Sequence, residues 1–501
     1  MELLDQLLLG LSTAATLNNF LYCLAGCVLG TMVGILPGVG PAPAIAMLLP
    51  MTFTLDPAGA LIMIAGIYYG AQYGGSTTAI LVNLPGESSS VVTAIDGHQM
   101  ARQGKAGLAL QVAAIGSFVA GCFATLMIAL FAPILTAAAL RFSAPEYFSL
   151  MLLGLIASIV LAHGSVMRAI GMCVLGLLIG TIGIDLTTGT HRFDFGMIDL
   201  SDGIDIVAVA VGMFGLGEVI HELQNGPSNR KANSVPFRDL IPRFSLLRPA
   251  VKPIIRGSLI GSVLGILPGG GALLSAFASY AVEKKLAKDP TRFGKGAIEG
   301  VAGPESANNA GAQTSFVPLL TLGLPSNPIM ALMAGAMIVH GLQPGPAIAR
   351  DQPEIFWGVI ASMWIGNLML LVLNLPLVGI WVKLLSVPYK MLYPAILIFC
   401  GIGVFTLNNS AFDIYVMVFF GLLGYVFRIL GAEPAPLLLG IILGPIMEEN
   451  LRRAMLMGRG DPMVFIERPI SATLLIIAIL ALIIVAIPAV SRKKDVALQE
   501  E

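Results

Sequence analysis

Residues 30–40 read GTMVGILPGVG, and residues 261–271 read GSVLGILPGGG. A second pair of similar segments follows in the same order, GAQYGGSTTAILVNLPGES from Gly70 and GAQTSFVPLLTLGLPSNP from Gly311. Two matched motifs in the same order predict a chain built by duplication from two related halves.

The composition is that of a membrane protein. The 501 residues are 56% hydrophobic and 11% charged, whereas soluble domains carry roughly 25% charged residues. Residues 106–140, 355–382 and 469–491 contain no Asp, Glu, Lys or Arg, and each run exceeds the roughly 20 residues that cross a bilayer as a helix. We predict an all-α polytopic membrane protein with about 10–12 spanning or half-spanning helices. Alternating segments typical of outer-membrane barrels are absent.

Several other classes of feature are not indicated. The start, MELLDQLLLG, has neither a basic segment nor a cleavage site, so we expect no removable signal peptide. The cysteines and histidines show no disulfide or metal-site spacing, so we expect them to pack or to lie at interfaces. The net charge is −1, and the basic residues fall in loops, so nothing indicates nucleic-acid binding.

The distribution of basic residues predicts the orientation in the membrane. The segments 226–256 and 283–296 are rich in Lys and Arg, so both should be cytoplasmic and 257–282 between them should be a re-entrant hairpin. Its counterpart near 16–55 has uncharged or acidic flanks and should open outward. The Asp-rich loop 185–202 should be external and the SRKKD tail cytoplasmic. Arg452, Arg453 and Arg459 do not fit this scheme, because they lie one crossing away from the tail.

Opposite hairpin orientations in related halves are typical of the inverted repeats of secondary transporters. The predicted organisation is a first repeat 1–225, with a hairpin near 16–55 and a polar broken helix near 57–86; a cytoplasmic linker 226–256; a second repeat 257–470, with the hairpin 257–282 and a polar broken helix near 305–328; and a terminal helix with a cytoplasmic tail, 471–501.

Each ILPGxG motif is predicted to interrupt a helix. Proline removes a backbone donor, glycine allows unusual dihedrals, and broken backbone inside a membrane persists only where protein or water lines it. The freed carbonyl groups could bind a coupling ion; the alternative is a kink that serves only packing. The ion-coupling candidates are Gly34, Pro37, Gly38, Gly40, Gly265, Pro268, Gly269, Gly271, Glu87 and Glu305.

The second pair of breaks is predicted to bind an anion. Half-helices that begin there present free N–H groups and a partial positive charge, and the surrounding segments contain almost no charged residues. The alternative for these polar side chains is ordinary hydrogen bonding between helices. The substrate-binding candidates are Ser76, Thr77, Thr78, Asn83, Pro85, Gly86, Ser88, Asn308, Asn309, Gln313, Thr314, Ser326 and Asn327.

Two acidic residues lie in these polar regions. A carboxylate within the membrane is a functional candidate by default, so Glu87 or Glu305 could hold a cation. Glu87 could equally cap the helix that it begins. The sequence leaves open whether the coupling ion is Na⁺ or H⁺.

At these residues the chain resembles the large membrane subunit of the tripartite tricarboxylate transporters, the TctA type of bacteria. The resemblance covers essentially the whole chain, and its most specific parts are NLPGES at 83–88 and GPESANNAGAQ at 303–313. It implies ion-driven uptake of an organic carboxylate, such as citrate or a related anion, across the bacterial inner membrane. The partners that it implies are a small four-helix membrane subunit and a periplasmic solute-binding protein, with a homodimer as an open alternative.

The sequence permits one alternative function and disfavours another. A cation antiporter without an organic substrate would also use inverted repeats with broken helices. An intramembrane enzyme is disfavoured, because the apolar runs contain neither HExxH nor a clear Ser/His arrangement. We therefore expect no enzymatic activity, and no cofactor other than the coupling ion.

Overall fold

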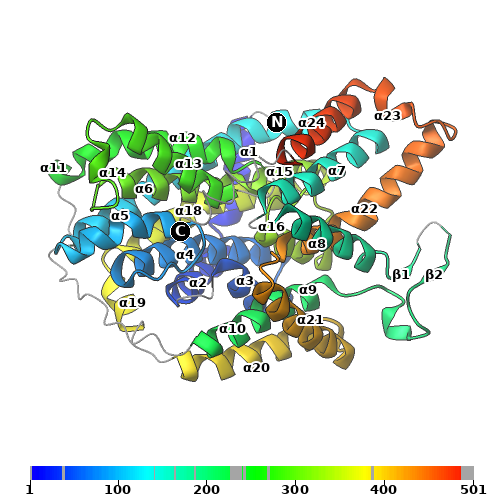
Figure 1. Ribbon diagram of the computed structural model, residues 1–501, viewed down its shortest axis with the longest axis horizontal. Coiled ribbons are helices and arrows are strands. Elements are labelled where there is room, and N and C mark those ends of the chain that lie inside the picture. Colours follow the sequence, from blue (N-terminus) through cyan, green and yellow to red (C-terminus); the bar gives the residue numbers. More distant parts are fainter. Residues whose placement is uncertain are drawn as a thin grey trace.

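The protein is described from a computed structural model, which covers residues 3–36, 40–139, 141–162, 165–185, 188–225, 240, 244–267, 271–384 and 389–486. Helices dominate the described residues (Figure 1). In the first half they are α1 (Leu3–Ala14), α2 (Leu17–Ile35), α3 (Pro41–Thr52), α4 (Pro57–Val82), α5 (Ser90–Arg102), α6 (Ala106–Ala139), α7 (Ala144–Leu161), α8 (Val166–Ile179), α9 (Ile206–Ala210) and α10 (Gly217–Asn225). A π-helical segment, Val211–Leu216, joins α9 to α10.

The second half is also helical. Its helices are α11 (Phe244–Leu247), α12 (Val251–Leu264), α13 (Gly271–Leu286), α14 (Glu299–Thr314), α15 (Phe316–Leu322), α16 (Pro328–Val339), α17 (Pro346–Asp351), α18 (Pro353–Asn374), α19 (Val378–Leu384), α20 (Tyr389–Asn408), α21 (Ala411–Ile429), α22 (Ala435–Met457), α23 (Val464–Glu467) and α24 (Pro469–Ala486). The strands of the described residues are β1 (Gly183–Ile184) and β2 (His191–Arg192), which pair antiparallel.

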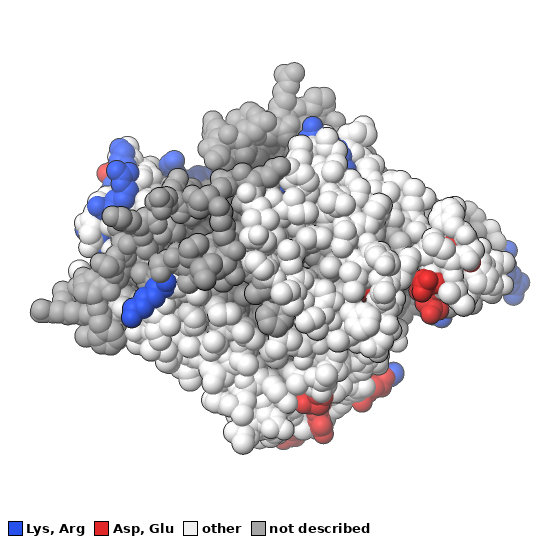
Figure 2. Space-filling view, turned by 90° about the horizontal axis from the view of Figure 1, so that it is seen from below, with Lys and Arg blue, Asp and Glu red and all other residues white. Residues whose placement is uncertain are grey.

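Four helices of the described residues are long and apolar enough to cross a membrane: α2, α6, α18 and α21. Shorter apolar helices accompany them, among them α3, α8 and α16. Most of the described surface on the face shown in Figure 2 is uncharged, and the charged side chains gather towards its margins. The predicted all-α polytopic membrane fold is confirmed.

The predicted helix breaks are present in both halves. In the first half α2 ends at Ile35 and α3 begins at Pro41, and in the second half α12 ends at Leu264 and α13 begins at Gly271. The predicted residues Pro37, Gly38, Pro268 and Gly269 lie outside the described residues. The second breaks separate α4 from α5 and α15 from α16. One further interruption was not foreseen: α14 ends at Thr314, within the predicted broken helix, and α15 follows.

Glycines allow α2 to pack directly on α4. A Cβ atom added to Gly30 would lie 2.2 Å from the carbonyl oxygen of Ile67, and one added to Gly34 would lie 2.3 Å from that of Ala71. The second half repeats this contact between α12 and α14, where a Cβ on Gly261 would lie 2.3 Å from the carbonyl oxygen of Ala307. Close backbone approach through small residues is typical of membrane helices. We refer to these two contacts as the glycine seams.

The α12–α13 segment folds back on itself. Arg256, near the start of α12, forms an ion pair with Glu283, near the end of α13, and its Nε lies 2.7 Å from Glu283 Oε1. The start of one helix therefore lies beside the end of the next, as in a hairpin. Its position relative to a membrane, and the inverted relation of the two repeats, remain predictions.

The arginines that did not fit the charge pattern lie beside acidic residues. Arg452 on α22 pairs with Asp185, which follows β1, at 2.9 Å. Glu448, one turn earlier on α22, accepts from Arg192 of β2 at 2.9 Å. Arg453 pairs with Glu449 on the same helix. The end of α22 and the β-hairpin are thus joined, which places Arg452 with the loop that was predicted to be external.

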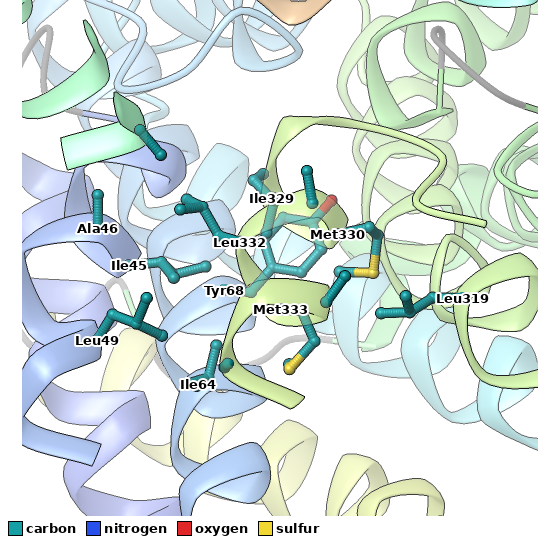
Figure 3. Close-up of a cluster of buried hydrophobic side chains, with 14 of the residues drawn as sticks. Ile45, Ala46, Leu49, Ile64, Tyr68, Leu319, Ile329, Met330, Leu332 and Met333 are labelled. Atoms are coloured by element: carbon teal, nitrogen blue, oxygen red, sulfur yellow. The ribbon is translucent and has the colours of Figure 1, made fainter. Parts of the chain in front are cut away.

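A buried apolar cluster lies where α3, α4 and α16 meet (Figure 3). Tyr68 of α4 packs among Ile45 of α3 and Met330 of α16, and all three side chains are buried. This cluster packs α3 and α16 against α4, and each of these two helices begins directly after a break.

Candidate functional site

A cavity of about 550 Å³ lies at the helix breaks. Its lining includes the starts of α3 and α13, the turn before α5, and the start of α16. Residues from these four places are Gly40, Pro41, Ala42, Pro43, Pro85, Gly86, Glu87, Ser88, Ser89, Gly271, Ala272, Leu273, Asn327, Pro328 and Ile329. The volume falls within the range of small-molecule sites. We refer to this space as the central cavity.

Four helix N-termini therefore border the central cavity. Gly40 precedes α3 with φ of 65°, a conformation that glycine adopts without strain. Asn327 caps α16, since its Oδ1 accepts from the backbone N–H of Met330 at 2.9 Å. The positive ends of helix dipoles, and those N–H groups that remain free, favour a bound anion. Pro41, Pro43 and Pro328 have no N–H to donate. The chemistry of this cavity suits a carboxylate.

Further lining residues come from distant parts of the chain. The lining also includes Tyr68 and Gln72 on α4, Phe214 in the π-helical segment, His221 on α10, Arg428 on α21 and Glu433 after α21. Sequence reasoning did not single out any of them, although Gln72 lies in the GAQ triplet that occurs in both halves. No local pattern indicates that His221 or Arg428 would reach this cavity.

Glu87 lies at the boundary of the central cavity, with 9% of its surface exposed. Its Oε1 accepts from Asn308 Nδ2 at 3.0 Å. Its Oε2 is buried and has no hydrogen-bond partner among the described residues. One acceptor of this carboxylate thus remains for a ligand or for water.

Glu305 is fully buried on α14. Its carboxylate accepts hydrogen bonds from the hydroxyl groups of Ser76 and Thr93, each at 2.8 Å. Ser117 Oγ and Asn309 Nδ2 donate to its Oε1 at 3.0 Å. Donors from α4, α5, α6 and α14 therefore converge on one carboxylate. Sequence reasoning had named Ser76, Asn309 and Glu305, but it had missed Thr93 and Ser117, which are isolated polar residues on other helices.

Adjacent residues connect the two carboxylates. On α14, Asn308 donates to Glu87 and Asn309 donates to Glu305. On α4, Gln72 lines the central cavity, and Ser76, one turn later, donates to Glu305. The two acidic residues are thus linked through α14, and α4 both contacts Glu305 and lines the cavity that Glu87 borders.

The other predicted substrate residues occupy different places. Thr77, Thr78 and Thr314 donate to carbonyl groups of their own helices, Gln313 accepts from Thr125, and Ser326 donates to the carbonyl group of Ser315. Asn83 is exposed and ends α4 with φ of 57°. Gly34 and Gly265 pack within the glycine seams. A role for these residues in binding remains a prediction.

Within the described residues, no group of three or more His, Cys, Asp or Glu side chains lies close enough to hold a metal ion. Hydroxyl, amide and backbone carbonyl oxygens would therefore have to supply most of the ligands of a cation at this site.

A comparison with known protein families identifies the family of this chain. Residues 20–439 match the model of the tripartite tricarboxylate transporter TctA family. The chain belongs to the TctA family. A protein from Agrobacterium vitis, described as an uncharacterized 52.8 kDa protein in the TAR-I ttuC' 3'region, is 56% identical to this TctA-family chain over 501 residues, which is 100% of both chains.

A second Agrobacterium vitis protein is described as an uncharacterized protein in the TAR-II ttuC' 3'region. It is 59% identical over 235 residues, which cover 47% of this TctA-family chain and 97% of its own. No solved structure matches this chain.

Proposed function

We propose that this TctA-family protein is the large permease subunit of a tripartite transporter in the bacterial inner membrane. It takes up an organic carboxylate, a tricarboxylate such as citrate or a related anion, and an Na⁺ or H⁺ gradient drives the uptake. A periplasmic solute-binding protein delivers the substrate, and a small four-helix membrane subunit completes the complex.

The central cavity is the observation that carries this proposal. Four helix N-termini border it, and they provide a positive potential for an anion without a large number of charged side chains. Asn327 and Gln72 add amide groups to its lining, Arg428 and His221 add basic groups, and Glu87 and Glu433 add carboxyl groups. A carboxylate bound here would contact both repeats.

Ion coupling belongs to the same proposal. The candidates are the backbone at the ILPGxG breaks and the carboxylates of Glu87 and Glu305. Transport would proceed by alternating access, with the hairpins and polar half-helices moving against the longer helices.

Asn327→Asp tests the cavity. Aspartate can replace asparagine as the cap of α16, but it puts a negative charge where the amide faces the central cavity. We expect uptake of radiolabelled citrate and related carboxylates to fall, with KM rising roughly 10- to 150-fold, since a hydrogen bond to a charged group contributes about 1.5–3 kcal/mol. Uptake is measured in proteoliposomes that contain the small subunit and the binding protein.

Ser410→Asp is the matched control, because Ser410 caps α21 and does not line the central cavity. This variant places an aspartate at the N-cap of α21, away from the central cavity, and uptake should equal that of the wild type. Equal uptake by Asn327→Asp and the wild type would remove the cavity as the substrate site. Cation exchange without any carboxylate flux would instead favour the antiporter.

A further inference from the structure

A second, much smaller cavity lies beside Glu305. Its volume is about 10 Å³, which is enough for one water molecule or one desolvated ion. Its polar lining residues are Tyr73, Ser76, Thr77, Ser117, Glu305 and Asn374. We refer to it as the ion cavity.

The charge at the ion cavity is unbalanced. In the part of the chain that the structure describes, no Lys, Arg or His side chain forms an ion pair with Glu305; its partners are neutral hydroxyl and amide groups. A buried carboxylate without a counter-charge is energetically costly. A bound cation would supply that charge.

The lining of the ion cavity also contains an amide oxygen that accepts no hydrogen bond from the described part of the chain. Asn374 on α18 is buried, with 3% of its surface exposed, and its Nδ2 donates to the carbonyl oxygen of Leu370 at 3.1 Å. Its Oδ1 has no hydrogen-bond partner among the described residues. A buried amide oxygen in the lining of an ion-sized cavity is the kind of ligand that a hard cation prefers.

We infer that Glu305, Ser76, Ser117 and Asn374 form a binding site for one Na⁺ ion. Their oxygen atoms come from a carboxylate, two hydroxyl groups and an amide, and they lie on α14, α4, α6 and α18. The single carboxylate matches a single positive charge. A proton on Glu305 would neutralise that charge but would fill none of the volume of the ion cavity. This inference rests on the proposed ion-coupled uptake and names its ion and its site.

The position of the ion cavity explains how Na⁺ and substrate would be coupled. Asn308 and Asn309 are consecutive residues of α14, and they contact Glu87 at the central cavity and Glu305 at the ion cavity, respectively. An ion that fixes Glu305 and Asn309 would also fix the helix turn that positions Asn308 and Glu87. By linkage, Na⁺ and the carboxylate then raise each other's affinity by the same factor.

Thermal unfolding tests the ion site apart from transport. The full-length protein, purified in detergent with its co-purifying subunits, is heated in increasing NaCl, with choline chloride holding the ionic strength constant. Na⁺ should raise the unfolding temperature in a saturable manner, and K⁺ should not. Glu305→Gln should abolish this shift. Asn374→Leu should raise the half-saturating Na⁺ concentration, by roughly 10- to 100-fold if the lost oxygen matters as other metal-supporting groups do.

Glu354→Gln is the matched control, because Glu354 is an exposed carboxylate on α18; its Na⁺ response should equal that of the wild type. If Glu305→Gln does not fold, Asn374→Leu decides alone, since it keeps the carboxylate. Equal Na⁺ and K⁺ responses in the wild type, or a normal Na⁺ response in both variants, would overturn the inference. So would a stability that depends on pH through Glu305 and not on Na⁺.

Uptake measured on the same preparations separates this inference from the proposed function. Na⁺ binding that requires Glu305, without carboxylate uptake by the wild type, would leave the ion site standing and remove the proposed function. Carboxylate uptake by the wild type together with unaltered Na⁺ binding in Glu305→Gln would do the opposite.

Discussion

Asn83 affects the candidate site through its backbone conformation and not through a contact of its side chain with the central cavity. It ends α4 in the left-handed region, with φ of 57°, which asparagine and glycine adopt more readily than other residues. Its side chain is exposed and does not line the central cavity. The conformation of the turn before α5 therefore depends on Asn83.

We predict that Asn83→Ala loses uptake while Asn83→Gly retains it. Alanine in the left-handed region costs roughly 1–2 kcal/mol, and this strain would displace the turn that carries Glu87. Initial uptake rates at matched protein levels give the comparison. Equal losses in both variants would show instead that the amide contacts the substrate.

Glu305 and its partners show what could be predicted at this scale. The sequence indicated Glu305, Ser76 and Asn309, because each is a polar residue in a strongly apolar region. It could not indicate Thr93, Ser117 or Asn374. The pairing of faces among α4, α5, α6, α14 and α18 depends on packing across more than 200 residues of sequence, such as the contact between Ser76 and Glu305.

The glycine seams belong to the scale of elements. At Gly30 and Gly261 a methyl group would meet a carbonyl oxygen of the neighbouring helix at 2.2 and 2.3 Å. These distances are far below ordinary contact, and neither backbone can move without its whole helix.

We predict that Gly30→Ala and Gly261→Ala each destabilise the protein by about 1–3 kcal/mol or more, as overpacking does. Thermal unfolding in detergent measures the effect. Gly171→Ala on α8 is the control, because a Cβ there meets nothing within 4 Å, and alanine favours a helix over glycine by roughly 1 kcal/mol. Equal stability in all three variants would mean that the helices separate without cost.

The α12–α13 hairpin gives a second prediction for an element. The Glu283 side chain is 1% exposed, whereas that of Arg256 is 34% exposed. Arg256→Met leaves a buried carboxylate without its partner, which costs about 3–5 kcal/mol. Glu283→Gln leaves an arginine that water can reach. Arg256→Met should therefore lower the unfolding temperature more than Glu283→Gln, and the reverse order would show that this pair does not join the hairpin.

The breaks themselves were predictable from Pro and Gly, since α2, α4, α12 and α15 all end close to the predicted motifs. The division of the second polar helix at Ser315 was not predicted. Phe316–Leu322 continues as α15 after that point. Pro318 has no N–H to donate to the carbonyl group of Thr314, and this signal was overlooked.

Topology is a property of the whole molecule. Arg452 pairs with Asp185, so the end of α22 and the loop after β1 share one side. Asp199 and Met463 are exposed near these regions, and Lys288 is exposed in the basic segment after α13.

We predict that single cysteines at Asp199 and Met463 react with an impermeant thiol reagent from outside, and that a cysteine at Lys288 reacts only from the cytoplasm. The native cysteines are first replaced, and labelling of intact cells is compared with that of inverted vesicles. A cysteine at Ser234, outside the described residues, should behave like the one at Lys288. Labelling of Ser234 and Lys288 from opposite sides would end the re-entrant interpretation of 257–282.

Orientation was the part of the whole molecule that the sequence predicted least completely. Lys and Arg counts suggested a side for each loop, but Arg452 and Arg453 conflicted with them. Their partners Asp185 and Glu449 show that these cations serve local ion pairs, and only the folded chain brings Asp185 to α22.

The glycine seams also restrict the relative motion of the helices that they join. If α2 slid along α4, larger side chains would take the places of Gly30 and Gly34 and would clash with the backbone of α4. A gradual sliding motion of the two helices is therefore disfavoured. The pair α2–α4 and the pair α12–α14 should each move as one rigid body throughout the transport cycle. Two spin labels, one on α2 and one on α4, should keep a constant separation during turnover, and so should a pair on α12 and α14. A pair with one label on α2 and the other on α12 should show two distances.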